Sequence, residues 1–357
     1  VGIYLEFSEW NRIYHNRLIG NTMQAYDSSD TNQWDNGYPS GGNYWSDYAG
    51  YDVFSGLNQD TPGSDGLGDT PYVIDSDSID RYPLMTPFQL IGPISPFPQS
   101  AFLTGRDLEN VTLMWALSPD DGQGLKSVVR YNIFRDTGYN PEGIGYSFLA
   151  SVPNGTSVII DVQTGEGNPN NYYYRVCAVD FGNNTRCSNQ QLGKITRPLS
   201  KGPNLVSIPI IQSDESLQTV LQTLSYDNAW SYDPINQEWK SFMKSKPYGQ
   251  GLEYVNHTMG IWVNVTEDSN LTVAGVVPTL TTINLQAGWN LVGFPSFDTN
   301  YTVADLKAVV LVERIEGFDA FAPPYFLRVM ADGNFLQAGF GYWIRVVTET
   351  SWTIGNP

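Results

Sequence analysis

The sequence predicts a mainly β, multidomain protein. Aromatic residues make up 13% of the chain and charged residues only 16%, alongside 34 glycines and 22 prolines. The apolar runs are short, as at residues 112–117, 157–160 and 308–312, and no long stretch repeats with the helical period. Such a composition is typical of β modules joined by turns. At roughly 100–200 residues per domain, a chain of 357 residues holds two to four domains.

The first module, residues 1–92, begins with short strand-like segments. Residues 2–7 and 11–21 are such segments, and asparagines stand at the corners between them. Asparagine fits the tight turns between the faces of a parallel β-helix. We therefore expect residues 1–92 to contain rungs of such a helix.

A family resemblance supports this expectation. Its segments are residues 13–16, 24–27, 34–47, 63–75 and 80–84. In order and spacing they resemble the C-terminal end of the NosD-type β-helix family, whose fold is shared by carbohydrate-binding proteins and sugar hydrolases. The resemblance implies the last rungs and closing cap of a right-handed parallel β-helix. The remaining rungs are expected upstream, so any activity located on them is not carried over to this chain.

An acidic, glycine-rich loop in this module is the candidate metal site. Ca²⁺ takes six to eight oxygen ligands from a tightly turning backbone. The predicted ligands are Asp47, Asp52, Asp60, Asp65, the Leu67 carbonyl and Asp69. The resemblance also implies a calcium-type loop here, although Pro62, Gly63 and Ser64 replace acids found in many relatives. The alternative is a solvated turn without an ion. Asp75, Asp77 and Asp80 form a second, weaker candidate cluster.

Aromatic side chains of the same module are candidate glycan contacts. Trp34, Tyr38, Tyr44 and Trp45 lie in a turn-rich segment. Exposed Trp and Tyr rings stack on sugars, whereas buried ones would close the end of the β-helix, which is the favoured interpretation. Four later tryptophans are predicted to be core residues: Trp230, Trp262, Trp289 and Trp343.

The second module, residues 99–198, follows a proline-rich linker at residues 91–98. It places Trp115 on an early strand, and residues 128–136 and 172–179 alternate with the period of a strand. This pattern resembles a fibronectin type III sandwich. The two cysteines of the chain, Cys177 and Cys187, lie ten apart around a turn at residues 180–184, and we expect a disulfide across that hairpin.

The rest of the chain is predicted to be an internal duplication, with copies at residues 199–278 and 279–357. Residues 202–209 parallel residues 288–295, and residues 260–265 parallel residues 341–346. Each copy carries a short helix candidate in the same place, at residues 217–224 and 303–309. We expect two strand–helix–strand units around a pseudo-twofold axis. They resemble Gly-Trp-Asn-Leu-Val repeat modules of secreted archaeal and bacterial proteins.

The charge and residue types argue against several functions. The formal net charge of −18 disfavours nucleic-acid and anionic-membrane partners, and no apolar stretch is long enough to insert into a bilayer. His15 and His257 fall in different predicted modules, so a histidine-based catalytic triad is not expected. No motif singles out a pair of catalytic carboxylates.

These features predict a non-catalytic extracellular or cell-surface region. The first hypothesis is a calcium-stabilised surface or adhesion region that contacts a polysaccharide or cell-surface glycan. The alternative is a carbohydrate-binding accessory region of a secreted polysaccharide-degrading enzyme whose catalytic domain lies elsewhere. The residues indicate no particular oligomeric state.

Overall fold

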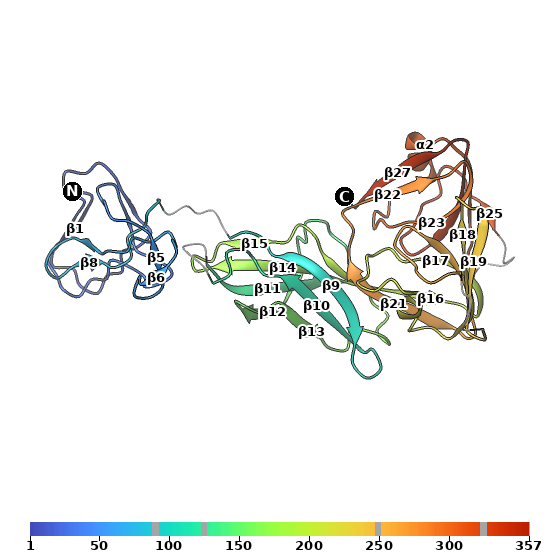
Figure 1. The fold of residues 1–357 in the computed structure, drawn as a ribbon, viewed down its shortest axis with the longest axis horizontal. Coiled ribbons are helices and arrows are strands. Elements are labelled where there is room, and N and C mark those ends of the chain that lie inside the picture. Colours follow the sequence, from blue (N-terminus) through green and yellow to red (C-terminus); the bar gives the residue numbers. More distant parts are fainter. Residues whose placement is uncertain (88–92, 123–126, 247–250, 322–326, 357) are drawn as a thin grey trace.

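A computed structural model of the chain describes residues 1–87, 93–122, 127–246, 251–321 and 327–356. Figure 1 shows three bodies: an N-terminal module, a β-sandwich and a pair of C-terminal repeats. Two short helices, α1 (Leu217–Val220) and α2 (Val303–Val309), are the α-helices of the described chain. Neither has the length and apolar character needed to cross a membrane. The mainly β, multidomain prediction is confirmed.

The N-terminal module contains parallel rungs. Its first four strands are β1 (Ile3–Leu5), β2 (Arg17–Leu18), β3 (Ala25–Asp27) and β4 (Tyr44–Trp45). β1 pairs with β3 and β2 with β4, both in parallel, so the chain returns to the same face after each turn. This is the pattern of a parallel β-helix, as the sequence predicts.

Asparagine side chains join the rungs at their corners. Asn11 Nδ2 donates to Asn32 Oδ1 at 3.0 Å, and Asn16 Nδ2 donates to Asn43 Oδ1 at 2.9 Å. The fully buried Asn43 also donates to the carbonyl of Ile13 at 2.8 Å. These bonds satisfy polar groups that the tight corners would otherwise leave buried without partners.

Two antiparallel hairpins close this module. They are formed by β5 (Phe54–Ser55) with β6 (Thr61–Pro62) and by β7 (Tyr72–Val73) with β8 (Ile79–Asp80). Leu67 and Leu84 form an isolated antiparallel bridge and pack with Tyr82 in a small core. The change from parallel rungs to hairpins is what a cap requires.

The middle module is a sandwich of two sheets. One sheet has the order β13 (Val158–Asp161), β10 (Asn110–Ala116), β9 (Phe97–Thr104); the other has β12 (Ser147–Pro153), β11 (Val128–Asp136), β14 (Tyr172–Asp180), β16 (Leu192–Leu199). Trp115 is fully buried between them against Tyr131. The predicted fibronectin III-like fold is confirmed. Ile91 and Gly92 of the predicted linker lie outside the described residues. Farther along the linker, the Ile94 N–H donates a hydrogen bond to Asp120 of the sandwich at 2.7 Å.

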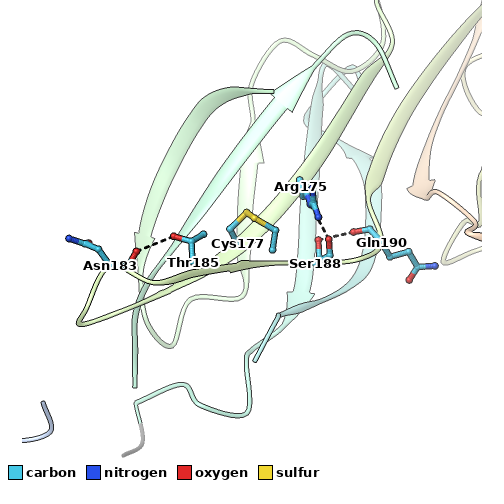
Figure 2. The surroundings of a disulfide bond; sticks show 7 residues. Arg175, Cys177, Asn183, Thr185, Ser188 and Gln190 are labelled. Atoms are coloured by element: carbon cyan, nitrogen blue, oxygen red, sulfur yellow. Dashed lines mark hydrogen bonds between the residues drawn. A yellow bond between two sulfur atoms is a disulfide. The ribbon is translucent and has the colours of Figure 1, made fainter. Parts of the chain in front are cut away.

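The disulfide lies where the spacing predicts. Figure 2 shows the bond between Cys177 on β14 and Cys187 on β15 (Thr185–Cys187), which stand opposite each other in the antiparallel register. Beyond it, Arg175 Nε donates to the Ser188 carbonyl at 3.0 Å. The short hairpin is therefore held to the sheet on both sides of the bond.

The two C-terminal repeats have the same strand order. The first contains β17 (Gly202–Ser207), β18 (Tyr226–Asp233), β19 (Glu238–Met243), β20 (Gly260–Val265) and β21 (Ser269–Val276). The second contains β22 (Leu280–Leu285), β23 (Gly288–Gly293), β24 (Val312–Gly317), β25 (Arg328–Val329), β26 (Gly341–Val346) and β27 (Thr350–Gly355). Their sheets run β17-β20-β18-β19 and β23-β26-β24-β25.

The shared Gly-x-Asn motif makes the same turn in both repeats. Gly202 and Gly288 have φ of 104° and 98°, which disfavours residues with a Cβ. Two residues later, the buried Asn204 Nδ2 donates to the Ser200 carbonyl at 2.7 Å, and Asn290 Nδ2 donates to Gln286 at 2.8 Å. The motif repeats because each sheet needs this turn at its first strand.

The contacts between the repeats obey a pseudo-twofold axis. Ser207 N donates to the Gly339 carbonyl and Gly293 N to the Thr258 carbonyl, both at 2.9 Å. Between the sheets, the Trp343 ring lies 5.4 Å from Tyr232, and the Trp262 ring lies 4.9 Å from Phe318. Each contact recurs with the repeats exchanged, as expected for units packed face to face.

One strand belongs to two modules. β16 pairs with β14 of the sandwich near its start, and along its whole length with β21 of the first repeat. In the second repeat, β22 pairs with β27 in the same way. β16 is thus both the last strand of the sandwich and the first strand of the first repeat. One sheet therefore extends across the module boundary that the sequence places between residues 198 and 199.

Candidate functional site

The acidic loop is ordered by hydrogen bonds from its own backbone. Asp52 accepts from the N–H groups of Asp65 at 3.0 Å and Gly66 at 2.8 Å, and from Ser64 Oγ at 2.7 Å. Asp69 accepts from the N–H groups of Val53 and Phe54 at 3.0 and 3.1 Å. These two carboxylates therefore hold the two halves of the loop together, residues 52–54 with residues 64–69.

The other predicted ligands point to different partners. Asp65 accepts from the N–H of Leu67 at 3.0 Å, and Leu67 itself is fully buried. Asp47 accepts from Tyr72 OH at 3.1 Å, and Asp60 is exposed. In the described part of the chain, the structure gathers no group of three or more acid, His or Cys side chains able to hold a metal ion. Calcium at this loop stays a prediction.

The second acidic cluster is divided between surface and core. Asp75 accepts from the N–H groups of Asp77 and Ser78 in a turn. Asp80 is fully buried and accepts from Trp45 Nε1 at 2.8 Å and from the Asn43 N–H at 2.6 Å. Burial raises the pKa of Asp80 to about 7. The three carboxylates therefore do not converge on one point.

Two further buried carboxylates were not predicted as functional or structural sites. Asp35 forms an ion pair with Arg81, with Oδ1 and Nη2 2.7 Å apart. Asp27 accepts from Trp34 Nε1 and Asn32 Nδ2, each at 2.8 Å. Burial acts to raise the pKa of both acids, but their hydrogen bonds hold it below the ordinary value. In the sequence they are single acids among 37 and carry no distinguishing signal.

The predicted glycan-contacting aromatics of this module lie largely inside it. Trp34 and Trp45 are fully buried, and their rings pack 5.9 Å apart. Tyr38 and Tyr44 are half-buried against the core of the cap. Indole rings held in this way have no face for a sugar, and their burial agrees with the favoured interpretation that Trp34 and Trp45 close the end of the β-helix rather than contact glycans.

A partly exposed aromatic cluster lies across the two repeats. It consists of Tyr232, Trp239, Trp289 and Trp343, and we call it the tryptophan cluster. Trp343 contacts the other three, with ring centroids at 5.4, 5.6 and 6.1 Å. Trp239 is 54% exposed. The prediction that Trp230, Trp262, Trp289 and Trp343 are core residues is wrong in this respect, because all four are only half-buried.

A cavity with both apolar and polar walls adjoins the tryptophan cluster at Tyr232. Its volume is about 250 Å³, and Tyr232 lines it. Asp233 and Lys240, which form an ion pair at 2.8 Å, line the same cavity together with Asn284. Aromatic faces beside hydrogen-bonding side chains form the kind of surface that sugars contact.

Solved structures with related β architecture share low similarity with the chain. Pectate lyase Pel3 from Pectobacterium carotovorum is 21% identical, with a TM-score of 0.21 over 27% of this chain and 25% of the lyase. The FN1–FN3 domains of chicken CNTN1 are 12% identical, with a TM-score of 0.21 over 74% of this chain and 94% of that chain.

The sequence matches are confined to a small part of the chain. Residues 1–50 match a family model described as "Periplasmic copper-binding protein (NosD)". The probable ABC transporter binding protein NosD of Stutzerimonas stutzeri is 41% identical over 83 residues, which are 23% of this chain and 16% of that protein. The chain thus spans less than a fifth of its relative's length.

The residues of the matched segment do not fit a copper centre. Protein copper sites use His, Cys and Met ligands. Residues 1–50 contain one histidine, His15, one methionine, Met23, and no cysteine. His15 Nε2 lies 2.8 Å from the Ser40 carbonyl oxygen. The N-terminal part of this chain is therefore similar to NosD in sequence, without the ligands that the family's description would call for.

Proposed function

We propose that this chain is a non-catalytic binding region of an extracellular or cell-surface protein, and that it attaches to glycans. The observation that carries the proposal is the tryptophan cluster, in which the exposed Trp239 ring lies 5.7 Å from the ring of Tyr232, and Tyr232 lines a cavity together with Asp233 and Lys240.

Sugar recognition is the chemistry that this surface supports best. A pyranose ring presents an apolar face of C–H groups and a rim of hydroxyls, so it pairs with an aromatic face flanked by polar side chains. Trp239 supplies the face. The ion-paired Asp233 and Lys240 and the Asn284 amide supply acceptors and donors at the rim. A purely apolar partner would cover the Asn284 amide and the ion pair without offering them hydrogen bonds.

A binding role without catalysis agrees with how the conspicuous acids are used. The Asp52 and Asp69 carboxylates accept backbone N–H bonds in the loop. His15 and His257 belong to different modules. The disulfide of the sandwich favours an oxidising compartment, which supports a surface location. Stabilisation of the loop by calcium and an adhesive role are the parts of the proposal that rest on the sequence.

Binding to an array of soluble polysaccharides tests the proposal. Wild-type chain is expected to bind at least one of them, and Trp239→Ala should weaken that affinity about tenfold, equivalent to about 1.4 kcal/mol. Trp10→Ala is the matched control, because Trp10 is 79% exposed but lies in the N-terminal module. Failure to bind any member of a broad array, or equal losses in both variants, would remove the proposal.

A further inference from the structure

A larger cavity lies between the sandwich and the second repeat. Its volume is about 640 Å³, within the range of small-molecule sites. Tyr139 and Tyr173 line it from the sandwich, Arg197 from β16, and Phe297 and Phe340 from the second repeat. No residue of the tryptophan cluster belongs to it.

Arg197 is a cation without a matching anion. Its guanidinium lies over the Phe340 ring at 3.5 Å from the centroid, and Nη1 donates to the carbonyl oxygens of Leu205 and Gly339. Across the described chain, Arg197 forms no ion pair, and its Nε and Nη2 groups have no hydrogen-bond acceptor. Burial lowers its pKa to about 10. The fold thus holds a half-buried positive charge with two donor groups that no protein acceptor uses in the described chain.

The carboxylates near the cavity are engaged elsewhere. Asp298 lines the cavity, but its Oδ1 accepts from the N–H of Asn300 at 2.9 Å. Asp319 acts on Arg197 only at a distance and accepts from the N–H of Phe321 at 2.9 Å. The fork of Arg197 is therefore available to a carboxylate brought by a ligand, which it would bind through two parallel hydrogen bonds.

The walls indicate what carries that carboxylate. Tyr139, Tyr173 and Phe297 form a triangle of rings with centroids 5.3 to 5.4 Å apart. In the described structure, the hydroxyls of the two tyrosines make no hydrogen bond to protein. Asn171 also lines the cavity and uses only its Oδ1 atom, which accepts from Thr196 N at 2.8 Å. Ring faces, hydroxyls and an amide donor together suit a hydroxylated ring.

We propose that this cavity binds a hexuronic acid residue, with Arg197 on the carboxylate and the aromatic triangle beside the sugar ring. The site goes beyond the proposed function, because it selects an acidic sugar and uses separate residues. Long-range repulsion by a chain of net charge −18 opposes an acidic ligand, so the selectivity comes from local contacts with Arg197.

Calorimetric titration of the whole chain tests the site with D-glucuronic acid, its methyl ester and D-glucose. The acid is expected to bind at least tenfold more tightly than the ester or glucose. Equal binding of acid and ester, or no binding of the acid, overturns the proposal, and neither result depends on a variant. Tighter binding of a short peptide through its C-terminal carboxylate would also overturn the assignment to a sugar.

Variants separate binding from a purely structural role. Arg197→Met should abolish binding of the acid and lower the melting temperature by only a few degrees, because methionine keeps much of the apolar stem and loses only the bonds to the Leu205 and Gly339 carbonyls and the contact with Phe340. Arg197→Lys should retain part of the affinity. Trp239→Ala should leave acid binding unchanged, which keeps this site distinct from the tryptophan cluster. A large fall in melting temperature for Arg197→Met, with acid binding retained, would show that Arg197 only ties β16 to the second repeat.

Discussion

Leu199 on β16 lies opposite Ser269 on β21, the last of a run of antiparallel pairs that begins with Leu192 opposite Val276. The sandwich and the first repeat therefore share one hydrogen-bonded sheet. Elements joined in this way are expected to unfold as one cooperative unit.

The first prediction is that damage to the first repeat loosens the sandwich. Leu271 on β21 is 3% exposed, and Leu271→Ala should cost about 2–5 kcal/mol. Hydrogen exchange of β14 amides should accelerate together with that of β20. Leu18→Ala, which removes an equally buried leucine from the N-terminal module, is the control and should leave β14 unchanged. If the β14 amides of Leu271→Ala stay as protected from hydrogen exchange as in the wild type, the sandwich and the first repeat unfold independently.

The second prediction concerns the close approach between the repeats. A Cβ on Gly341 would lie 2.9 Å from Leu205 Cδ1 and 3.0 Å from the Val206 carbonyl oxygen. Gly341→Ala should destabilise by about 1–3 kcal/mol in chemical denaturation. Gly333→Ala is the comparison, because no atom lies within 4 Å of the added methyl group. Similar denaturation midpoints for the two variants would argue against the close approach of Gly341 to Leu205 and Val206.

The third prediction is a pH dependence set by Asp80. Burial raises its folded-state pKa to about 7 from an ordinary value of 3.8. The folded state therefore holds the proton more tightly, and this stabilisation is complete below pH 3.8 and lost as pH rises to about 7. The melting temperature of the N-terminal module should fall across that window. Asp80→Asn should flatten the profile, and Asp77→Asn, at an exposed position, should not. A wild-type profile that rises over the same range would contradict the assignment.

The fourth prediction concerns the disulfide. Cys177 and Cys187 should resist alkylation in the native, unreduced protein, as intact-mass measurement will show. Closing so short a loop stabilises by roughly 2–3 kcal/mol, so reduction should lower the melting temperature of the sandwich. Two alkylatable thiols before reduction would be inconsistent with the bond.

The fifth prediction is the calcium dependence expected from the sequence. Added Ca²⁺ should raise the melting temperature of the N-terminal module. At a Ca²⁺ concentration of a hundred times the dissociation constant, the free energy of unfolding should increase by about 2.7 kcal/mol. Asp60→Asn is the informative variant, since Asp60 is exposed and makes no hydrogen bond in the described loop. It should reduce the calcium effect without changing stability in EDTA, whereas Asp30→Asn should do neither. A melting temperature that changes with neither Ca²⁺ nor EDTA would show that the hydrogen bonds from backbone N–H groups to Asp52 and Asp69 hold the loop without an ion.

Local patterns explain which parts of the fold were predictable. The spacing of Cys177 and Cys187 follows from hairpin geometry, and the duplicated Gly-x-Asn motif follows from a turn that each repeat makes at Asn204 and Asn290. Such features depend on neighbours in sequence. The residue types and their spacing along the chain are therefore enough to predict them.

Features that depend on long-range packing were not predictable. Trp34 and Trp239 are both tryptophans in polar, turn-containing sequence, yet one is fully buried and the other 54% exposed. The partner of β16 is a strand that starts 70 residues after β16 ends, at Ser269. Arg197 stands between Thr196 and Pro198 with nothing in the sequence to distinguish it, and only the folded structure shows that no carboxylate of the described residues forms an ion pair with it.

The pairing of β16 with β21 also decides where this protein can be joined by another chain. An uncovered edge strand offers backbone N–H and C=O groups to any extended segment, which invites strand addition or aggregation. β21 occupies that position along the full length of β16. The opposite border of the same sheet is β12, which pairs only with β11 in the described chain. Pairing with β21 thus moves the other border of the sheet away from the sandwich, and β12, where Phe148 is 60% exposed, is the border that the sandwich itself offers for strand addition.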